Sequence, residues 1–134
     1  MKLYLAAGFS RKHEIAGKSL ELENLGINVT STWPWEDAAP DSKLTEVSDD
    51  YLRLNARKDL YEIINSDGLI LFTQSPLKPF CRGGRMHEAG FAMGLGKTIM
   101  VCGPKENIFH WLPEIAQFDT WERLKQALTT AIIV

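Results

Sequence analysis

The residues best suited to chemistry lie in one glycine-rich stretch, Gly83-Gly84-Arg85-Met86-His87-Glu88. Two glycines let a ligand approach the backbone closely, and an arginine can hold a phosphate through two hydrogen bonds. We expect Glu88 in the first turn of a helix, where the helix dipole should keep its carboxylate ionised. Aimed into a cleft, that carboxylate could attack an anomeric carbon, although a glutamate at a helix start can also simply complement the dipole.

Asp59 offers a second carboxylate. It lies beside Leu60 and Ile63, near the apolar stripe of a predicted helix over residues 48–65. A carboxylate on a half-buried face needs a partner or a function. Together with Glu88 it could protonate a leaving base, as paired carboxylates do in glycosidic cleavage.

The loop after the first predicted strand, Ala7-Gly8-Phe9-Ser10-Arg11, is a second candidate binding segment. Amides at a helix start, a hydroxyl and a basic side chain suit a phosphate or sugar hydroxyls. The segment matches neither a dinucleotide-binding motif nor a P-loop, and an ordinary turn with a solvated basic residue also explains it.

Aromatic side chains could stack on a nucleobase. Trp33 and Trp35 stand in a polar segment, residues 32–44, that we expect to be an irregular loop with exposed aromatics, and Phe9 is a further candidate. Tryptophan in an α/β sandwich is more often part of the core, which is the alternative for each of these residues.

The histidines and cysteines predict no metal site. The three histidines lack metal-ligand spacing, and Cys81 and Cys102 form no CxxC pair. His87 neighbours Glu88 and could orient that carboxylate or contact substrate. So few cysteines indicate a reducing compartment, the cytoplasm.

Strands and helices that could position these residues alternate along the chain. Predicted strands cover residues 2–7, 27–31, 68–72, 98–102 and 115–118, and predicted helices cover 11–25, 48–65, 85–95 and a last segment to about 130. This alternation requires right-handed crossovers and a parallel sheet with helices on both faces. The sequence therefore predicts an α/β fold, a flavodoxin-like or Rossmann-like three-layer sandwich with a five-stranded parallel sheet.

Polar residues mark the expected helix starts. Ser10 and Ser48 are expected N-caps, and Asp119 with Glu122 forms a capping-box pattern before the last helix. Ligands of such sheets bind beyond the carboxyl ends of the strands, so the loops after the first, third and fourth strands should converge on one site.

Composition limits the class of protein. The 134 residues suffice for one domain, residues 1–134, with a full core, and 45% hydrophobic with 24% charged residues exclude a disordered chain. A net charge of −2 gives no general attraction to nucleic acid polymers or anionic membranes. No apolar run approaches the length of a membrane span or of a signal-peptide core, so we expect a soluble cytoplasmic protein.

Three segments in order resemble the nucleoside 2-deoxyribosyltransferase superfamily, including its branch of nucleoside 5′-monophosphate N-glycosidases. They are KLYLAAGFSRKH, RKDLYEIINSDGLILFTQSP and GGRMHEAGFAMGLGKTIMV, and together they cover most of residues 1–103. The resemblance implies a flavodoxin-like fold and a small-molecule nucleotide or nucleoside substrate. It also implies an enzyme that needs no metal or organic cofactor and forms a homodimer or larger homo-oligomer.

The resemblance also implies residue roles. The family nucleophile, the glutamate of E-x-G-x-A, falls on Glu88, and the aspartate that contacts the nucleoside and assists proton transfer falls on Asp59. The residues that would hold a 5′-phosphate are Gly8, Ser10, Arg11, Gly83, Gly84 and Arg85, while Trp33 or Trp35 would cover the base. Free-nucleoside transferases carry an acidic residue where this chain has Arg82, and this departure favours a phosphorylated substrate.

The expected reaction is N-glycosidic cleavage of a (deoxy)ribonucleoside 5′-monophosphate through a glycosyl ester of Glu88. Base exchange by a nucleoside 2-deoxyribosyltransferase, cleavage of another N-ribosyl compound, and nucleotide binding without cleavage are the alternatives. A flavodoxin-like electron carrier is disfavoured, because the first loop lacks the serines and threonines of a flavin phosphate loop. The apolar end, residues 131–134, fits a subunit contact or a terminal edge strand.

Overall fold

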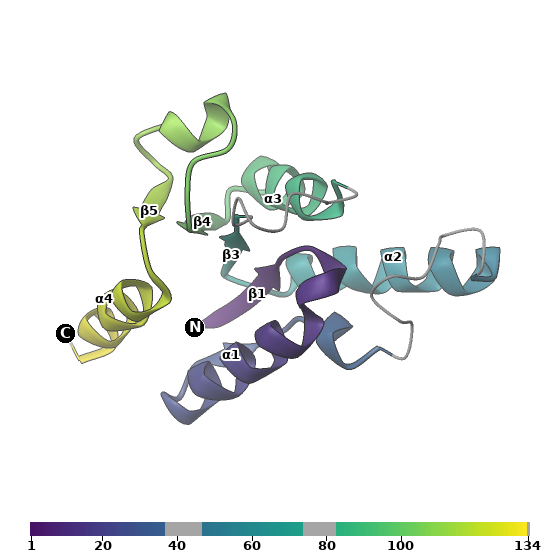
Figure 1. Ribbon diagram of the computed structural model, residues 1–134, viewed down its shortest axis with the longest axis horizontal. Helices are drawn as coiled ribbons and strands as arrows, with labels where there is room; N and C mark the ends of the chain where they lie inside the picture. Colours follow the sequence, from purple (N-terminus) through teal and green to yellow (C-terminus); the bar gives the residue numbers. More distant parts are fainter. Residues whose placement is uncertain (37–46, 74–82, 134) are drawn as a thin grey trace.

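The computed structural model describes residues 1–36, 47–73 and 83–133, which form a five-stranded sheet between two layers of helices (Figure 1). The strands are β1 (Lys2–Ala6), β2 (Asn28–Val29), β3 (Gly68–Phe72), β4 (Thr98–Cys102) and β5 (Ala116–Phe118). All neighbouring pairs are parallel, in the order β2-β1-β3-β4-β5. This is the flavodoxin-like order, so the predicted α/β sandwich is confirmed.

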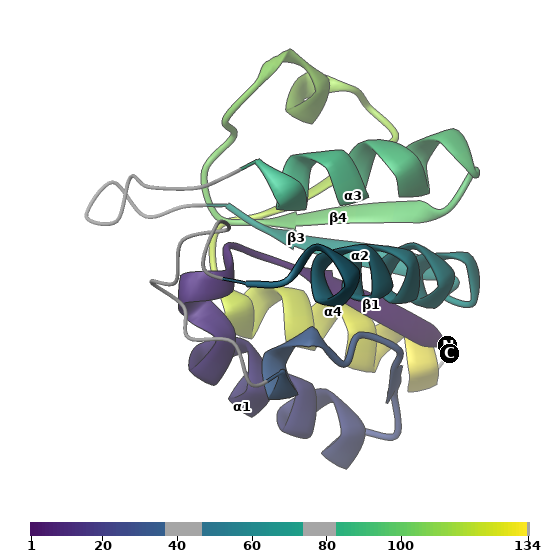
Figure 2. The same cartoon turned by 90° about the vertical axis from the view of Figure 1, so that its right-hand side faces the viewer.

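Helices cover both faces of the sheet. On one face lie α1 (Lys12–Asn24) and α4 (Trp121–Ile133), and on the other lie α2 (Asp49–Ile64) and α3 (Gly84–Gly94) (Figures 1 and 2). Short 3-10 helices occur in the connections: η1 (Phe9–Arg11), η2 (Trp33–Trp35) and η4 (Ile108–Trp111). None of the helices in the described ranges is long and apolar enough to cross a membrane.

The central strands form the core. Every residue of β3 is buried, and β1 and β4 are buried after their first residue. Ile15 of α1 and Ile63 of α2, from helices on opposite faces of the sheet, belong to the core and have no exposed surface. Burial of one such side chain contributes about 1.5–3 kcal/mol, so the strands give a firm base to the loops at their carboxyl edge.

The predicted N-cap at Ser48 is confirmed, whereas the one at Ser10 is wrong. Ser48 Oγ accepts a hydrogen bond from the Tyr51 amide at 3.2 Å. Ser10 instead lies inside η1, where the Arg11 amide donates to the Gly8 carbonyl at 2.9 Å. Because of this tight turn, α1 begins only after Arg11, and no side chain caps its first amides.

The last helix also differs from expectation at both ends. It begins at Trp121 because Thr120 Oγ1, rather than Asp119, accepts a hydrogen bond from the Arg123 amide at 3.2 Å. The helix then continues to Ile133. The alternative of a terminal edge strand is therefore wrong for the described part of this segment.

The second strand is shorter than the predicted residues 27–31. Only Asn28–Val29 pairs with β1 as a strand. Farther along, the Leu5 amide donates to Ser31 Oγ at 3.1 Å, so a serine side chain replaces the backbone ladder. The chain then turns into η2, which places a tryptophan beside the end of β1.

Candidate active site

A cavity of about 350 Å³ lies at the carboxyl end of β1, between η2, α2 and α3. Strand order reverses between β1 and β3, and ligands of open parallel sheets bind at such a reversal. Most of the predicted site residues line this cavity: Ala7, Gly8, Phe9, Ser10, Trp33, Asp59, Gly84, Arg85, His87 and Glu88. The structure thus brings together segments that are distant in the sequence.

Glu88 is held on the β1 side of α3. Tyr4 Oη in β1 donates a hydrogen bond to Glu88 Oε2. Burial and the negative charge of Glu88 hold the pKa of the Tyr4 phenol well above its usual range, so the phenol keeps its proton and stays a donor. Tyr4 therefore fixes the direction of the carboxylate without adding a positive charge.

The expectation that the helix dipole keeps Glu88 ionised is wrong. Glu88 lies beyond the first turn of α3, which begins at Gly84. Burial raises the pKa of Glu88 to about 8, and the negative charge of Asp59 adds to this, while the hydrogen bond from Tyr4 acts in the opposite direction. Loss of solvent outweighs a dipole whose effect fades within the first turn.

Asp59 is the second carboxylate of the cavity and projects from α2. Its buried Oδ1 has no hydrogen-bond partner among the described residues, and Lys58 Nζ lies 3.8 Å away. Burial, followed by the negative charge of Glu36, raises the pKa of Asp59 to about 7, although Lys58 acts in the opposite direction. An under-compensated carboxyl group with a near-neutral pKa, in a cavity, is suited to proton transfer.

The loop after β1 and the start of α3 form another part of the wall. Gly8 and Ser10 come from that loop, and Gly84 is the first residue of α3, where helix amides lack intrahelical acceptors. Gly83 precedes the helix with φ of +89°, a conformation that favours glycine, and it does not line the cavity. These elements could hold an anion through amides and a hydroxyl.

Both arginines predicted for phosphate binding have carboxylate partners. Arg11 does not line the cavity, because its guanidinium binds Glu14 at 2.7 and 2.9 Å and the Thr73 carbonyl at 3.0 Å. Arg85 does line it, but its guanidinium is buried against Glu106 with N–O distances of 2.8 and 3.1 Å. Their role in binding a substrate stays a prediction. Arg82 lies outside the described residues.

The two tryptophans of η2 have different environments. Trp33 is 4% exposed, lines the cavity and donates its indole N–H to the Leu5 carbonyl at 2.7 Å. Trp35 is 54% exposed and does not line the cavity. The expectation of an exposed aromatic is therefore wrong for Trp33, whose ring forms part of the wall together with Phe9. His87 also lines the cavity and is exposed.

Sequence reasoning missed several residues that the fold brings to the cavity. Tyr4 was hidden in an apolar strand, although a buried phenol that needs a hydrogen-bond partner was a usable signal. Glu36, Ala56 and Leu60 complete the lining. Their approach to the β1 loop depends on the tertiary path of the chain, which no local pattern specifies.

Metal ligands are not grouped in the described ranges. Within residues 1–36, 47–73 and 83–133, no three His, Cys, Asp or Glu side chains are placed so that they could hold a metal ion. Cys81 lies outside these ranges, and Cys102 is buried in β4. The described side chains with ionisable or hydroxyl groups that line the cavity are those of Ser10, Glu36, Asp59, Arg85, His87 and Glu88.

Solved structures share this fold over nearly the full chain. A 2-deoxyribosyltransferase from the psychrotolerant bacterium Bacillus psychrosaccharolyticus matches with a TM-score of 0.71, 22% identity and 96% of each chain covered. The CMP N-glycosidase BcmB of Clostridium botulinum matches with a TM-score of 0.61, 19% identity and 100% of each chain covered. A conserved protein from Enterococcus faecalis V583 matches with a TM-score of 0.60, 14% identity and 98% of each chain covered.

No protein-family model matches the chain, and no curated protein matches it in sequence. The structural neighbours nevertheless include both enzyme types of the superfamily that the sequence resembles, a 2-deoxyribosyltransferase and an N-glycosidase. The resemblance is thereby confirmed at the level of the fold.

Proposed function

We propose that this protein is an enzyme that cleaves the N-glycosidic bond of a (deoxy)ribonucleoside 5′-monophosphate through a glycosyl ester on Glu88. One observation carries the proposal: Glu88 and Asp59 line the same cavity, and Tyr4 holds Glu88 by a hydrogen bond. The two enzymes named among the structural neighbours, a 2-deoxyribosyltransferase and a CMP N-glycosidase, support a reaction at the bond between base and sugar.

In the first step, a Glu88 carboxylate oxygen attacks C1′ of the sugar. The bond between C1′ and the base nitrogen breaks, and its electron pair leaves with the base. Asp59 donates a proton to that base, directly or through water, and becomes a carboxylate. The products of this step are the free base and a glycosyl ester of Glu88.

In the second step, water attacks C1′ of the ester. Asp59 accepts a proton from this water, the bond from C1′ to Glu88 breaks, and Glu88 returns as a carboxylate. Two displacements on opposite faces of the sugar retain the configuration at C1′. The Tyr4 hydrogen bond supports Glu88 both as an attacking and as a leaving carboxylate.

The reactive form holds one proton on the pair of carboxyl groups. Burial raises their pKa values to about 7 for Asp59 and about 8 for Glu88, and the negative charge of Asp59 raises the pKa of Glu88 further. Tyr4 stabilises the negative charge on Glu88, whereas Asp59 Oδ1 has no donor among the described residues. Attack requires an ionised Glu88 and proton donation requires a protonated Asp59. Because Glu88 has the higher pKa, this reactive arrangement is the less populated of the two forms that hold one proton.

Gly8, Ser10 and the first amides of α3 are the proposed site of the 5′-phosphate. They combine backbone donors, a hydroxyl and the positive end of an eleven-residue helix. Base exchange by a 2-deoxyribosyltransferase is a second candidate, because Arg85 is already paired with Glu106 and a transferase is among the structural neighbours. In that reaction a second base would replace water.

Chromatographic detection of free base tests these candidates. The protein is incubated with ribo- and deoxyribonucleoside 5′-monophosphates and with the matching nucleosides, and Glu88→Ala serves as the control. Base released only from monophosphates, and lost in the variant, supports the glycosidase. Release from nucleosides that increases with an added acceptor base supports the transferase, and binding without any release supports a nucleotide-binding module.

A further inference from the structure

The cavity wall formed by η1, η2 and α2 combines apolar surface with carboxylate oxygens. The rings of Phe9 and Trp33 lie with their centroids 6.0 Å apart, and Leu60 adds aliphatic surface. The indole N–H of Trp33 already donates to the Leu5 carbonyl at 2.7 Å. This aromatic corner can therefore contact the faces and edges of a base but offers no donor from Trp33.

Glu36 places a carboxylate in this wall at a fixed position. Its side chain is 15% exposed and lines the cavity. Lys12 Nζ donates to the Glu36 carbonyl, and Lys58 Nζ donates to Glu36 Oε1. Because both the backbone and one carboxylate oxygen are held, the second oxygen has a restricted position, and no donor among the described residues binds it.

Lys58 does not change the hydrogen-bonding character of this wall. Besides Glu36, its ammonium group contacts Thr32 Oγ1 at 3.0 Å and lies 3.8 Å from Asp59 Oδ1. Glu36 and Thr32 use two of its three N–H groups, and Lys58 itself does not line the cavity. The polar groups that this wall presents to a ligand are therefore the carboxylate oxygens of Glu36 and Asp59, which accept hydrogen bonds. The exception is the proton that Asp59 transfers.

We infer that Glu36 makes the site selective for bases with an exocyclic amino group, over analogues that carry an oxygen at the same position. This inference rests on the proposed function. An amino group can donate to the free Glu36 oxygen, whereas an oxo oxygen would face a carboxylate and leave both acceptors unpaired. The preferred substrates are thus cytosine or adenine nucleotides rather than uracil or hypoxanthine nucleotides.

Matched substrates test the selectivity. Base release is measured with CMP against UMP and with AMP against IMP, in ribo and deoxyribo forms. We expect kcat/KM to favour the amino member of a pair by about ten- to a hundredfold, the range for a carboxylate that reads an amino group. In Glu36→Gln the preference should shrink toward equality, because a carboxamide can donate as well as accept.

Glu62→Gln is the matched control. Glu62 lies on α2, which forms part of the cavity wall, and accepts hydrogen bonds from Thr32 at 2.6 and 3.0 Å, but it does not line the cavity. It should leave the preference unchanged. If Glu36→Gln does not fold, Glu36→Asp retains the charge while withdrawing it from the base, and the preference should again decrease.

Equal rates for both members in the wild-type protein, or an unchanged preference in the folded Glu36 variants, overturn the inference. If no substrate releases base, the proposed function fails. The inference is then tested by measuring the binding of free cytosine and of free uracil through the change in tryptophan fluorescence. Preferential binding of cytosine that Glu36→Gln removes supports it. Equal binding of the two bases overturns it.

Discussion

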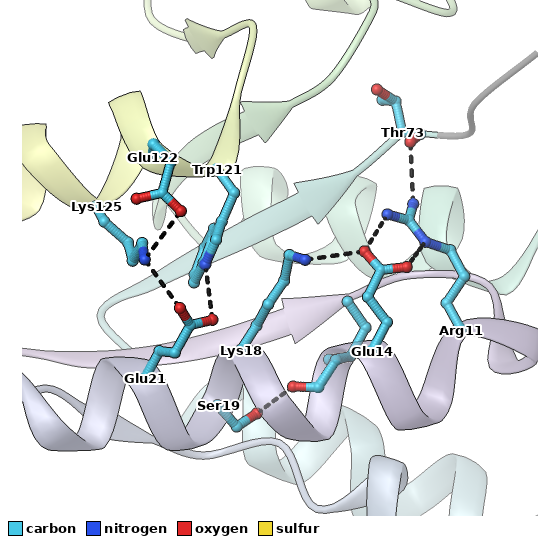
Figure 3. Close-up of polar contacts among 10 residues, drawn as sticks. Arg11, Glu14, Lys18, Ser19, Glu21, Thr73, Trp121, Glu122 and Lys125 are labelled. Carbon is cyan, nitrogen blue, oxygen red and sulfur yellow. Dashed lines mark hydrogen bonds and ion pairs between the residues drawn. The ribbon is translucent and has the colours of Figure 1, made fainter.

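Carboxylates on the two faces of the sheet have opposite electrostatic environments. Between α1 and α4, every drawn carboxylate meets cations (Figure 3). Glu14 binds Arg11 and Lys18 at 2.7 and 3.0 Å, and its hydrogen bond with Arg11 is the main reason that its pKa falls to about 2. Glu21 accepts from Lys125 at 2.9 Å, and this bond lowers its pKa.

On the cavity face two carboxylates, Glu88 and Asp59, have too little compensating positive charge. Glu88 receives a neutral phenol, and Asp59 has a lysine only at 3.8 Å. Their pKa values rise to about 8 and 7, chiefly through burial. The α1–α4 face thus uses carboxylates to hold helices together, whereas the cavity keeps them in an arrangement that costs stability. Such an arrangement is typical of functional sites.

The largest expected effect is on activity. Glu88→Gln should lower the rate of base release by about a thousandfold or more, because an amide cannot form the glycosyl ester. Glu14→Gln removes a carboxylate of the same length from the other face and should leave kcat within about threefold, since Glu14 does not line the cavity. Similar losses of activity in Glu88→Gln and Glu14→Gln would show that the different electrostatic environments of the two faces do not determine which carboxylate is catalytic.

Asp59→Asn should lower kcat by about a hundredfold, the usual size of a lost proton donor. In the wild-type protein, activity should be highest between about pH 7 and 8, where the pair holds one proton. Below this range Glu88 is protonated and cannot attack. Above it Asp59 has no proton for the base.

The pH profile of Asp59→Asn sharpens this assignment. Its alkaline limb should disappear, because the group that loses its proton there is gone. Its acidic limb should remain, because Glu88 must still lose its proton before it can attack. Rates of base release between pH 5 and 10 measure both limbs, and a persistent alkaline limb would assign the proton donor elsewhere.

The layout of the fold could be predicted because it depends on short-range patterns. Apolar runs at 68–72 and 98–102 match β3 and β4 residue for residue, and buried parallel strands need such runs. The carboxyl ends of these strands necessarily share one edge of the sheet. That is why Gly8 and Glu88, which follow β1 and β3, could be expected near one another before their contacts were known. Asp59 lies inside α2, and it was expected at the site from its half-buried helix face and from the family resemblance.

The electrostatics of the site could not be predicted in the same way. Whether Arg85 faces a phosphate or a carboxylate depends on Glu106, 21 residues later in the chain. The charge state of Glu88 depends on burial and on Tyr4, 84 residues earlier. Helix position alone predicted an ionised carboxylate, because the dipole is a local property whereas desolvation is a property of the folded molecule.

The smallest expected effects are on stability, and the two faces should respond to pH with opposite signs. The pKa of Glu88 is raised in the folded protein, so its contribution is fully present below about pH 4.5 and is lost as the pH rises through 8. Glu88→Gln keeps an acceptor for Tyr4 but has no charge to bury. It should therefore unfold at nearly the wild-type denaturant concentration at pH 4 and at a clearly higher denaturant concentration than the wild-type protein at pH 9, a gain of a few kcal/mol in the free energy of unfolding.

Glu14 has a lowered pKa, so its contribution is present above about pH 4.5 and is lost as the pH falls toward 2. Glu14→Gln should be less stable than the wild-type protein at pH 7 by only about 0.5 kcal/mol, because the pair is half-exposed and screened by solvent. Urea unfolding between pH 3 and 9 measures both variants. With rising pH, Glu14→Gln should become less stable than the wild-type protein and Glu88→Gln should become more stable. Such opposite changes support the contrast between the two faces, because ionisation stabilises the folded protein at a carboxylate paired with cations and destabilises it at a buried carboxylate without a cation.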